Sequence, residues 1–243
     1  MNSTIDQIAK HRSIRKFTEE PVPQEAISQA VEAAQQAATS SNVQAYSILQ
    51  IRDHNVRSDL SKLCGNQEKV VACGAFFIVC ADSRRHRLLA KQAEKKYESH
   101  LEGFLVGVID ASLFAQNLAL AFESMNLGIC YIGGLRNDLP KVGKLLRFPE
   151  GVYPLFGLCV GHPGEEPFKR PRLPAEAVLF TDQYPTDQEM LDLVARYDQQ
   201  MSDYYTKRGA SGRTWSPTIA AFHEAPRRES LAAFYVKQGA DLS

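Results

Sequence analysis

The chain has 243 residues, 44% of them hydrophobic, which is enough apolar material for a sizeable core. Lysine plus arginine equals aspartate plus glutamate at 28 each, and this balance argues against nucleic-acid binding, which usually shows as a basic excess. No uninterrupted apolar run reaches the roughly 18 residues of a membrane span. The polar stretch from Met1 to Lys10 does not resemble a signal peptide, so we expect a cytoplasmic protein without membrane contact.

The five cysteines are an odd set without a CxxC pair. A disulfide framework is therefore not expected, and the pattern is typical of buried thiols in a reducing compartment.

The first half of the chain alternates between helical and strand patterns. A short helix is predicted from Thr4 to His11, and an Ala-, Gln- and Glu-rich helix from Gln24 to Ala38. A loosely alternating strand over Ala45 to Arg52 precedes a helix from Asn55 to Cys64. The nearly continuous apolar run from Ala75 to Ala81 predicts a strand buried on both faces.

The middle of the chain holds its most apolar stretch, Val106 to Leu127, after a charged, helical segment from Arg84 to His100. The apolar stretch contains two charges, Asp110 and Glu123, and its apolar residues occur around the full circumference of a helix. Such a helix must be covered on all sides, and a second copy of the chain could supply part of the cover. We therefore expect a homodimer, with Gly128 as the C-cap of this helix.

The second half continues with a short strand from Ile129 to Ile132, a helix from Leu139 to Arg147 and a core strand from Pro154 to Val160. The remainder is polar and predicts an extended arm with one or two helices. Interleaved helices and strands indicate an α+β or α/β fold in three layers. We expect one domain over residues 1–243, with residues 185–243 as a C-terminal extension.

Several common site types are absent from the sequence. There is no GxGxxG after a strand and no GxxxxGK[ST], so neither phosphate loop is supported. The histidines include no HExxH and no Cys/His pairing at zinc spacing, and we expect no metal. The stretch from Gly209 to Gly212 lacks the spacing of a nucleophile elbow.

Cationic loops remain as candidate sites. His11, Arg12, Ser13 and Arg15 fall within five residues, and arginine forks bind phosphate in bidentate fashion. A solvated basic turn explains the same residues equally well, so the residues alone leave both interpretations open.

Two further segments carry weaker signals. Arg170 and Arg172 lie among prolines that stiffen the backbone, which suits an anion, although a surface linker explains them better. Gly133 and Gly134 follow a strand and would allow a flat ligand to approach the backbone, although an ordinary turn is the simpler interpretation.

Taken together, the segments resemble the group A oxygen-insensitive nitroreductases and NADPH:flavin oxidoreductases of bacteria. The matching stretches occur in the family's order and cover nearly the whole chain: HRSIRKFT at 11–18, ATSSNVQAYSI at 38–48, GNQ at 65–67, AQNLALAFESMNLGICYIGGLRN at 115–137, PLFGLCVGHP at 154–163, RPRLPA at 170–175 and YYTKRGASGRTWS at 204–216.

The resemblance implies a nitroreductase-like α+β fold, with a central mixed sheet flanked by helices, in an intertwined homodimer that binds FMN at the subunit interface. Bound FMN would carry the chemistry, so no catalytic side chain is expected. The residues implied to bind FMN are His11, Arg12, Ser13, Arg15, Ser40, Ser41, Gln67, Tyr131, Ile132, Gly133, Gly134, Arg170 and Arg172. Arg208 matches an arginine that recognises NADPH, and Arg213 is the candidate for a second.

The function implied is NADPH-dependent reduction of nitroaromatics, quinones or free flavins by ping-pong hydride transfer. Two other hypotheses stay open: a flavin reductase whose product is free reduced FMN, and a non-catalytic flavin-binding module. A regulatory protein that binds an anion and no flavin is a third alternative.

Overall fold

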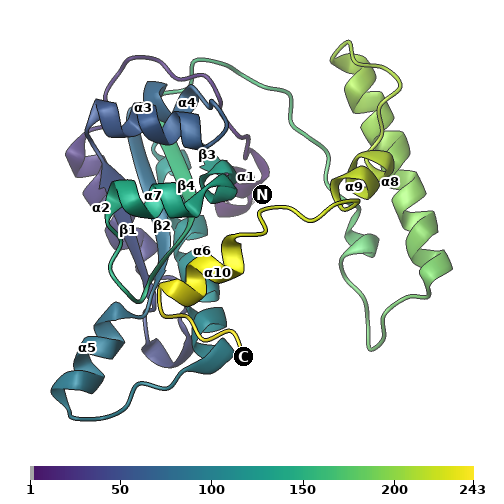
Figure 1. Cartoon of the computed structure of the whole chain (residues 1–243). Coiled ribbons are helices and arrows are strands. Elements are labelled where there is room, and N and C mark those ends of the chain that lie inside the picture. The colour runs from purple at the N-terminus through teal and green to yellow at the C-terminus, as the bar shows by residue number, and fades with distance from the viewer. Residues whose placement is uncertain (1–2) are drawn as a thin grey trace. The chain divides into compact units, whose positions relative to one another are not determined.

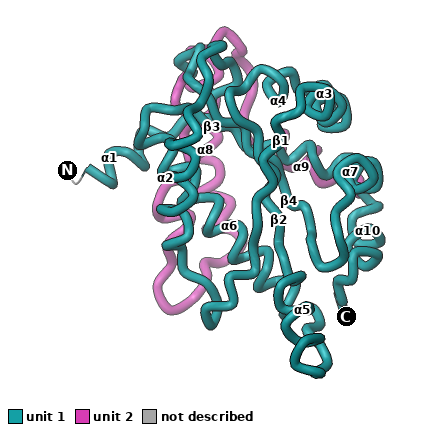
Figure 2. The backbone as a smooth tube through the Cα atoms, turned by 90° about the vertical axis from the view of Figure 1, so that its left-hand side faces the viewer, with its two compact units in different colours: residues 1–167, 228–243 teal, residues 168–227 magenta. Residues whose placement is uncertain are grey.

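The computed structural model describes residues 3–243 and divides the chain into two compact units (Figure 2). The first unit comprises Met1–Pro167 and Arg228–Ser243, and the second comprises Phe168–Arg227. The chain therefore passes from the first unit to the second after Pro167 and returns to the first unit at Arg228. Whether the two units fold as one domain stays a prediction.

The first unit is built on a four-stranded sheet in the order β1-β2-β4-β3 (Figure 1). The strands are β1 (Tyr46–Ile51), β2 (Ala75–Asp82), β3 (Gly128–Ile132) and β4 (Val152–Gly161), and every neighbouring pair is antiparallel. The mixed sheet expected from the sequence is therefore wrong. Strand direction depends on the end of the sheet to which each connection returns, and local sequence patterns do not record this.

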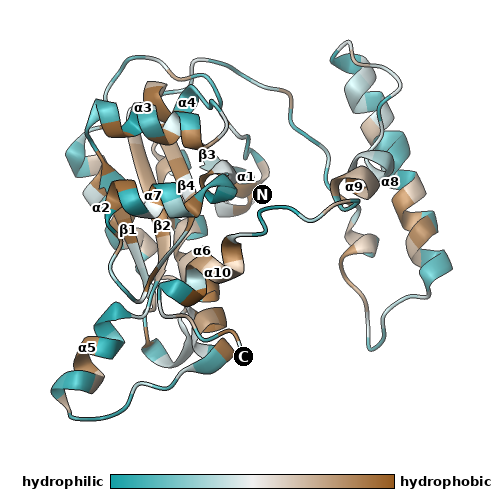
Figure 3. Ribbon diagram, viewed as in Figure 1, coloured by the Kyte–Doolittle hydropathy of each residue, from teal (hydrophilic) through white to brown (hydrophobic). Residues whose placement is uncertain are grey.

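Side chains alternate across the sheet and form two cores. On β2, Phe77 and Val79 join one apolar cluster, whereas Phe76 and Ile78 join the other. All eight residues of β2 are buried, as the continuous apolar run predicts. Figure 3 shows the hydrophobic residues concentrated on these strands.

Helices cover both faces and complete three layers. On one side lie α2 (Gln24–Ala34) and α6 (His100–Ser124), and on the other lie α3 (His54–Leu63) and α7 (Leu139–Leu146) (Figure 2). The short α4 (Lys69–Ala72) packs beside α3. The three-layer α+β architecture is confirmed.

The central helix α6 starts six residues before its predicted start. Its end is also different, because Met125 is the C-cap and Asn126 takes the left-handed conformation expected of Gly128. Gly128 instead begins β3, where a Cβ atom would lie 2.6 Å from the Ile14 side chain. Glycine is therefore required there by close packing and not by helix capping.

One face of α6 packs on the sheet through Phe114, Leu118 and Phe122. Another face exposes Leu101, Leu105, Ile109 and Leu113, a stripe at four-residue spacing. Among residues 3–243, α6 is also the one helix long and apolar enough to cross a membrane by length and composition, a test that core helices of soluble proteins pass as well. The first unit alone thus leaves this stripe uncovered.

The remaining helices of the first unit are α1 (Ser3–Ala9), α5 (Arg84–Gln92) and α10 (Leu231–Lys237). Helix α5 is shorter than the charged segment that predicts it. All five cysteines are free and buried in this unit, as their burial was predicted.

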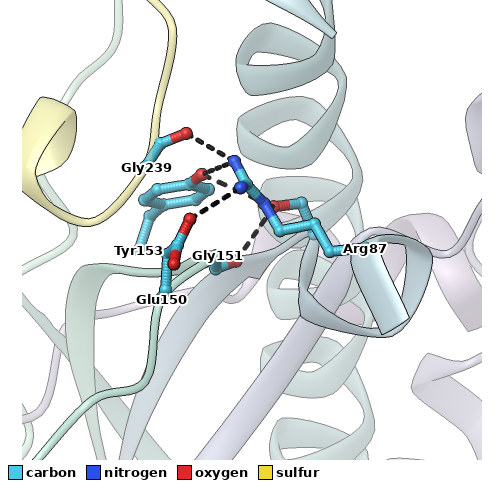
Figure 4. Close-up of polar contacts among 6 residues, drawn as sticks. Arg87, Glu150, Gly151, Tyr153 and Gly239 are labelled. Carbon is cyan, nitrogen blue, oxygen red and sulfur yellow. Dashed lines mark hydrogen bonds and ion pairs between the residues drawn. The ribbon is translucent and has the colours of Figure 1, made fainter. Parts of the chain in front are cut away.

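Arg87 on α5 ties the C-terminal segment to the sheet (Figure 4). Its Nη1 lies 2.9 Å from Glu150, and its Nη2 donates to the Tyr153 hydroxyl and to the carbonyl of Gly239. The chain that returns after the second unit is therefore anchored beside β4.

The second unit contains α8 (Asp187–Lys207) and α9 (Ser216–Phe222). With α10, the last 60 residues form three helices, one more than expected. Tyr197, Met201 and Tyr204 of α8 make a small core with Trp215. Asp198 fastens α9 to α8 by accepting hydrogen bonds from the backbone N–H groups of Trp215 and Ser216 at 2.8 and 2.9 Å.

Candidate functional site

The cationic segment after α1 runs alongside the sheet. The N–H of Ile14 donates to the carbonyl of Ile129 at 2.9 Å, and Ser13 forms a parallel bridge with Ile129 on β3. Ile14 is buried, so an extended backbone turns its neighbours Ser13 and Arg15 away from the core. The sheet edge thereby displays the polar residues of this segment.

Each cationic residue of the segment lies against a carboxylate. Nδ1 of His11 is 2.6 Å from Oε1 of Glu123, at the end of α6. Nη1 of Arg12 is 2.7 Å from Oε1 of Glu166, and the N–H of Arg15 donates to Glu165 at 2.7 Å. Glu166 is 84% exposed and Glu123 only 9%, so the two acidic partners differ in how freely they can move.

A hollow of about 330 Å³ opens beside this segment. Its lining includes the cationic residues Lys10, His11 and Arg12 and the carboxylates of Glu123, Glu165 and Glu166, but not Ser13 or Arg15. Nε of Arg12 is buried without a hydrogen-bond partner among the described residues. A buried N–H of a guanidinium costs free energy unless an acceptor reaches it. The residues present therefore fit a phosphate group, which would supply that acceptor.

A second part of the site lies where β3 ends. Nε2 of Gln67 donates to the carbonyl of Cys64 at 2.7 Å. A Cβ on Gly134 would lie 2.5 Å from that Nε2 and 2.4 Å from the carbonyl oxygen, so only glycine allows this packing. The structure thus brings Gln67 and Gly134 together.

Gly133 differs from Gly134. A Cβ at Gly133 would meet only the Arg136 side chain within 4 Å, at an ordinary contact distance of 3.5 Å, so Gly133 is much less crowded than Gly134. Ile132 is fully buried and can present only its backbone to a ligand, whereas Tyr131 is 36% exposed. This strand end therefore offers backbone groups and space to a flat ring.

Burial and nearby charges at the end of β3 shift the pKa values of Tyr131 and Cys130. Burial raises the pKa of Tyr131, and the Glu123 carboxylate raises it further, so the phenol stays protonated. Its hydroxyl donates to the carbonyl of Ala115 at 2.8 Å. Burial also raises the pKa of Cys130, while the nearby cations Arg15 and Lys69 lower it. Lys69 is thus a cation of this region that the sequence did not single out.

Ser40 and Ser41 lie elsewhere in the unit. They form a 3-10 turn in which Ser41 has a φ of 47°, and Asn42 and Gln44 are also left-handed. The Asp110 carboxylate, fully buried on α6, accepts hydrogen bonds from the N–H groups of Ser40 and Ala45 at 3.1 and 3.0 Å. Asp110 therefore compensates the backbone strain of this turn.

The register of the sheet separates this turn from the cationic segment. Tyr46, just after the turn, is opposite Ala81, which is opposite Tyr153 at the start of β4. The cationic segment bridges β3 near Gly128, which is opposite Gly161 at the other end of β4. Within one chain, the two serines and residues 11–15 lie at opposite ends of the sheet.

Two of the acidic residues of α6, Asp110 and Glu123, contact the segments at the two ends of the sheet. Asp110 holds the serine turn and Glu123 contacts His11, and 13 residues of helix separate them by about 20 Å. Sequence reasoning noted these charges without giving them roles. Charged residues in an otherwise apolar helix were the signal that could have identified them.

The second unit holds the other four candidate arginines. Nη1 of Arg208 donates to the Tyr204 hydroxyl at 3.0 Å, and the guanidinium of Arg170 lies 6.0 Å from the centre of the same ring. Arg172 donates to the carbonyl of Arg170 at 3.2 Å. Arg213 lies between α8 and α9. The structure thus brings Arg170 and Arg208 together, while their approach to residues 11–15 stays a prediction.

Comparison with known proteins matches both parts of the chain. The nitroreductase family matches residues 8–162, and the C-terminal domain of the nitroreductase family matches residues 170–243. An FMN reductase (NADPH) of Bacillus subtilis is 44% identical, with 98% of each chain covered. An oxygen-insensitive NADPH nitroreductase of Salmonella typhimurium is 40% identical, again with 98% of each chain covered.

Solved structures agree with this assignment. A nitroreductase from B. subtilis has a TM-score of 0.94 at 43% identity, covering 98% of this chain and 99% of that one. An NADPH:FMN oxidoreductase from Vibrio harveyi, solved with NAD+, has a TM-score of 0.90 at 37% identity, covering 99% of both chains. The sequence motifs, the fold and these full-length similarities lead to one conclusion: the chain belongs to the nitroreductase family.

Proposed function

We propose that this chain is an FMN-dependent NADPH oxidoreductase that reduces nitroaromatics, quinones or free flavins. The observation that carries the proposal is the cationic segment at residues 11–15, where the Nε of Arg12 is buried beside a hollow and has no partner within residues 3–243. Relatives of full length, named as an NADPH-dependent FMN reductase and as a nitroreductase, support the same activity.

In this proposal, the chain's own residues bind and orient the cofactor. His11, Arg12, Ser13 and Arg15 hold the phosphate and the ribityl chain, with help from Arg170 and Arg172. Gln67 and the backbone from Tyr131 to Gly134 orient the ring, and the absence of a side chain at Gly133 leaves room for it. Bound FMN would take up hydride from NADPH and pass it to the oxidant, so no side chain needs to act as nucleophile or metal ligand.

In this proposal one face of the bound flavin stays open, and the order of the steps follows from this. NADPH binds first, with Arg208 on its 2′-phosphate and Arg213 as a candidate second contact. The oxidised nicotinamide leaves, and the oxidant then occupies the same place. Shared use of one face requires ping-pong kinetics.

A homodimer completes the proposed site. Ser40 and Ser41 lie at the opposite end of the sheet from residues 11–15, so one chain cannot place both beside one FMN. Two copies related by a two-fold axis can, because each can contribute its cationic segment to one site and its serine turn to the other. The exposed stripe of Leu101, Leu105, Ile109 and Leu113 is the surface that such a dimer would bury.

The testing experiment uses the purified protein. We expect a yellow protein with about one FMN per chain, which oxidises NADPH rapidly only when a nitroaromatic, quinone or free flavin is present. A colourless protein that gains no flavin absorbance on addition of FMN would refute the proposal. Flavin binding without NADPH oxidation would instead favour a non-catalytic flavin-binding module.

A second candidate function is release of reduced FMN as the product, and the relatives named as FMN reductase and NADPH-flavin oxidoreductase favour it. A panel of oxidants compared by kcat/KM at fixed NADPH separates the two. A free flavin that exceeds every nitroaromatic and quinone would favour the flavin reductase.

A further inference from the structure

Glu123 is a largely buried charge in the last turn of an apolar helix. Its side chain is 9% exposed, and its neighbour Phe122 is fully buried in the core. Burying a carboxylate costs free energy unless a partner compensates it. The partner here is His11, whose Nδ1 is 2.6 Å from Oε1 of Glu123. An apolar residue would pack at this position at lower cost, so the contact with His11 is what accounts for the glutamate.

The contact fixes which nitrogen of His11 faces which neighbour. An ionised carboxylate only accepts, so Nδ1 must carry the hydrogen of this bond. Nε2 is then the nitrogen that remains for a ligand in the hollow that both residues line. If the ring were neutral, Nε2 would be an acceptor and would repel a phosphate oxygen. The ring binds phosphate only when it carries both hydrogens.

Several other charged groups face this hollow. Lys10 and Arg12 are its cations, and Glu165 and Glu166 are its further carboxylates. Glu166 is 84% exposed on a loop, so a phosphate can displace it from Arg12. Glu123 is held in the last turn of α6 and cannot move away from His11 in this way. It is therefore the carboxylate that stays when the ligand arrives.

We propose that Glu123 is a positioning residue, which fixes the His11 ring as an imidazolium with its Nε2–H directed to the phosphate of the flavin. The proposal rests on the proposed function, because it takes the FMN phosphate to lie at His11. Glu123 itself does not touch the ligand. It acts by holding the ring in one orientation, with Nδ1 towards Glu123 and Nε2 left for the ligand.

The test measures binding of FMN and of riboflavin to the apoprotein by quenching of flavin fluorescence. Riboflavin has the same ring and ribityl chain and lacks the phosphate. We expect Glu123→Gln to raise the dissociation constant of FMN by about 5- to 20-fold, since the hydrogen bond from His11 loses its charged acceptor. The dissociation constant of riboflavin should change by less than about twofold. Glu102→Gln, an exposed glutamate in the first turn of α6, is the matched control and should change neither.

A double-mutant cycle tests whether Glu123 acts through His11. His11→Asn should weaken FMN binding, and adding Glu123→Gln to it should cause little further loss, because the two residues act as one unit. Glu123→Asp, which keeps the charge on a shorter side chain, should recover part of the affinity. Fully additive losses would overturn the proposal, as would equal damage to FMN and riboflavin.

A spectroscopic readout keeps the proposal testable if Glu123→Gln does not fold. In the wild-type FMN complex, the ¹⁵N chemical shifts of the His11 ring should show hydrogens on both nitrogens. A neutral ring in that complex would overturn the proposal. Wild-type protein that binds no FMN would refute the proposed function instead, so the two failures are distinguishable.

Discussion

Nη1 of Arg208 donates a hydrogen bond to the Tyr204 hydroxyl at 3.0 Å, and the same guanidinium lies 5.4 Å from the centre of the Tyr204 ring. Tyr204 is nearly buried in the small core of the second unit. Burial raises its pKa, but hydrogen bonds from Arg170 and Arg208 outweigh burial, so its pKa lies below the ordinary value. Arg208 is therefore held at the end of α8 before any ligand binds, although its loop is basic and exposed.

This placement leads to a prediction on cofactor choice. We expect Arg208→Ala to raise the KM for NADPH by roughly 5- to 30-fold, because one charge-assisted contact with the 2′-phosphate is lost. The kinetics with NADH and the rate at saturating NADPH should barely change, since the contact is equal in the ground and transition states. Steady-state kinetics with both cofactors measure this.

Arg196→Ala is the matched control, because Arg196 is an exposed arginine of α8, the helix that Arg208 caps. Equal damage to NADPH and NADH kinetics by Arg208→Ala would show that Arg208 acts on the shared part of the cofactor or on the fold.

A second prediction concerns Arg15. Its guanidinium is exposed and reaches only the carbonyl of Ser13, at 3.3 Å, among the contacts of the described chain, so its loss should spare the fold. We expect Arg15→Ala to raise the dissociation constant of FMN by roughly 10- to 100-fold. Fluorescence titration of the apoprotein measures it, with the adjacent Lys16→Ala as the control. An unchanged dissociation constant would contradict this placement.

The segment that carries Glu165 and Glu166 leads to a prediction of tighter FMN binding, opposite in sign to the effect of Arg15→Ala. The Glu166 carboxylate forms an ion pair with the Arg12 guanidinium in this structure. FMN must therefore displace Glu166 before this guanidinium can bind the phosphate. We expect Glu166→Gln to lower the dissociation constant of FMN by about 2- to 5-fold, a modest gain because exposed ion pairs are weak. Riboflavin binding should not change. Weaker FMN binding in this variant would mean that Glu166 supports the site.

The dimer prediction uses the exposed stripe of α6. Ile109 is 55% exposed in the single chain, and a charge at its position would be buried unpaired in the proposed interface. We expect wild-type protein to be a dimer at all workable concentrations, and Ile109→Glu to produce a monomer that has lost FMN. Light scattering and flavin absorbance measure both properties.

Leu89→Glu on α5 is the control, since Leu89 is equally exposed and lies outside the stripe. A wild-type monomer that still reduces nitrofurans would contradict the shared site.

Asp198 gives a pH-dependent prediction. Burial raises its pKa, but the hydrogen bonds from Ser216 and Trp215 lower it more, so the pKa lies below the ordinary 3.8. A group with a lowered folded pKa contributes stability above its unfolded pKa and loses it as the pH falls through the folded value. The link between α8 and α9 should therefore hold at neutral pH and begin to weaken below about pH 4, with full loss only below the lowered pKa of Asp198.

Limited proteolysis tests this link. We expect Asp198→Asn to increase tryptic cleavage between Lys207 and Arg213 several-fold at neutral pH, because local opening becomes more frequent. Asp203→Asn, on the same helix, is the control, because the Asp203 carboxylate accepts a hydrogen bond from Gln199 of α8 and not from α9. An unchanged cleavage rate in Asp198→Asn would show that other contacts hold α9.

The sequence by itself determined the elements and their burial. The apolar run at Ala75–Ala81 and the helix around Val106–Leu127 were recognisable because hydrophobic periodicity follows directly from which faces must leave water. The ordered series of motifs from residue 11 to residue 216 also identified the family, since their joint occurrence is far more specific than any one of them.

Tertiary structure alone decided how these elements combine. The antiparallel order of the strands depends on where each connection returns, and this is a long-range property. The same holds for Asp110 on the Ser40 turn and Glu123 on His11, which lie 70 and 112 residues from their partners. Local propensity cannot predict such contacts, because the free energy that favours a buried charge comes entirely from a partner that folding brings to it.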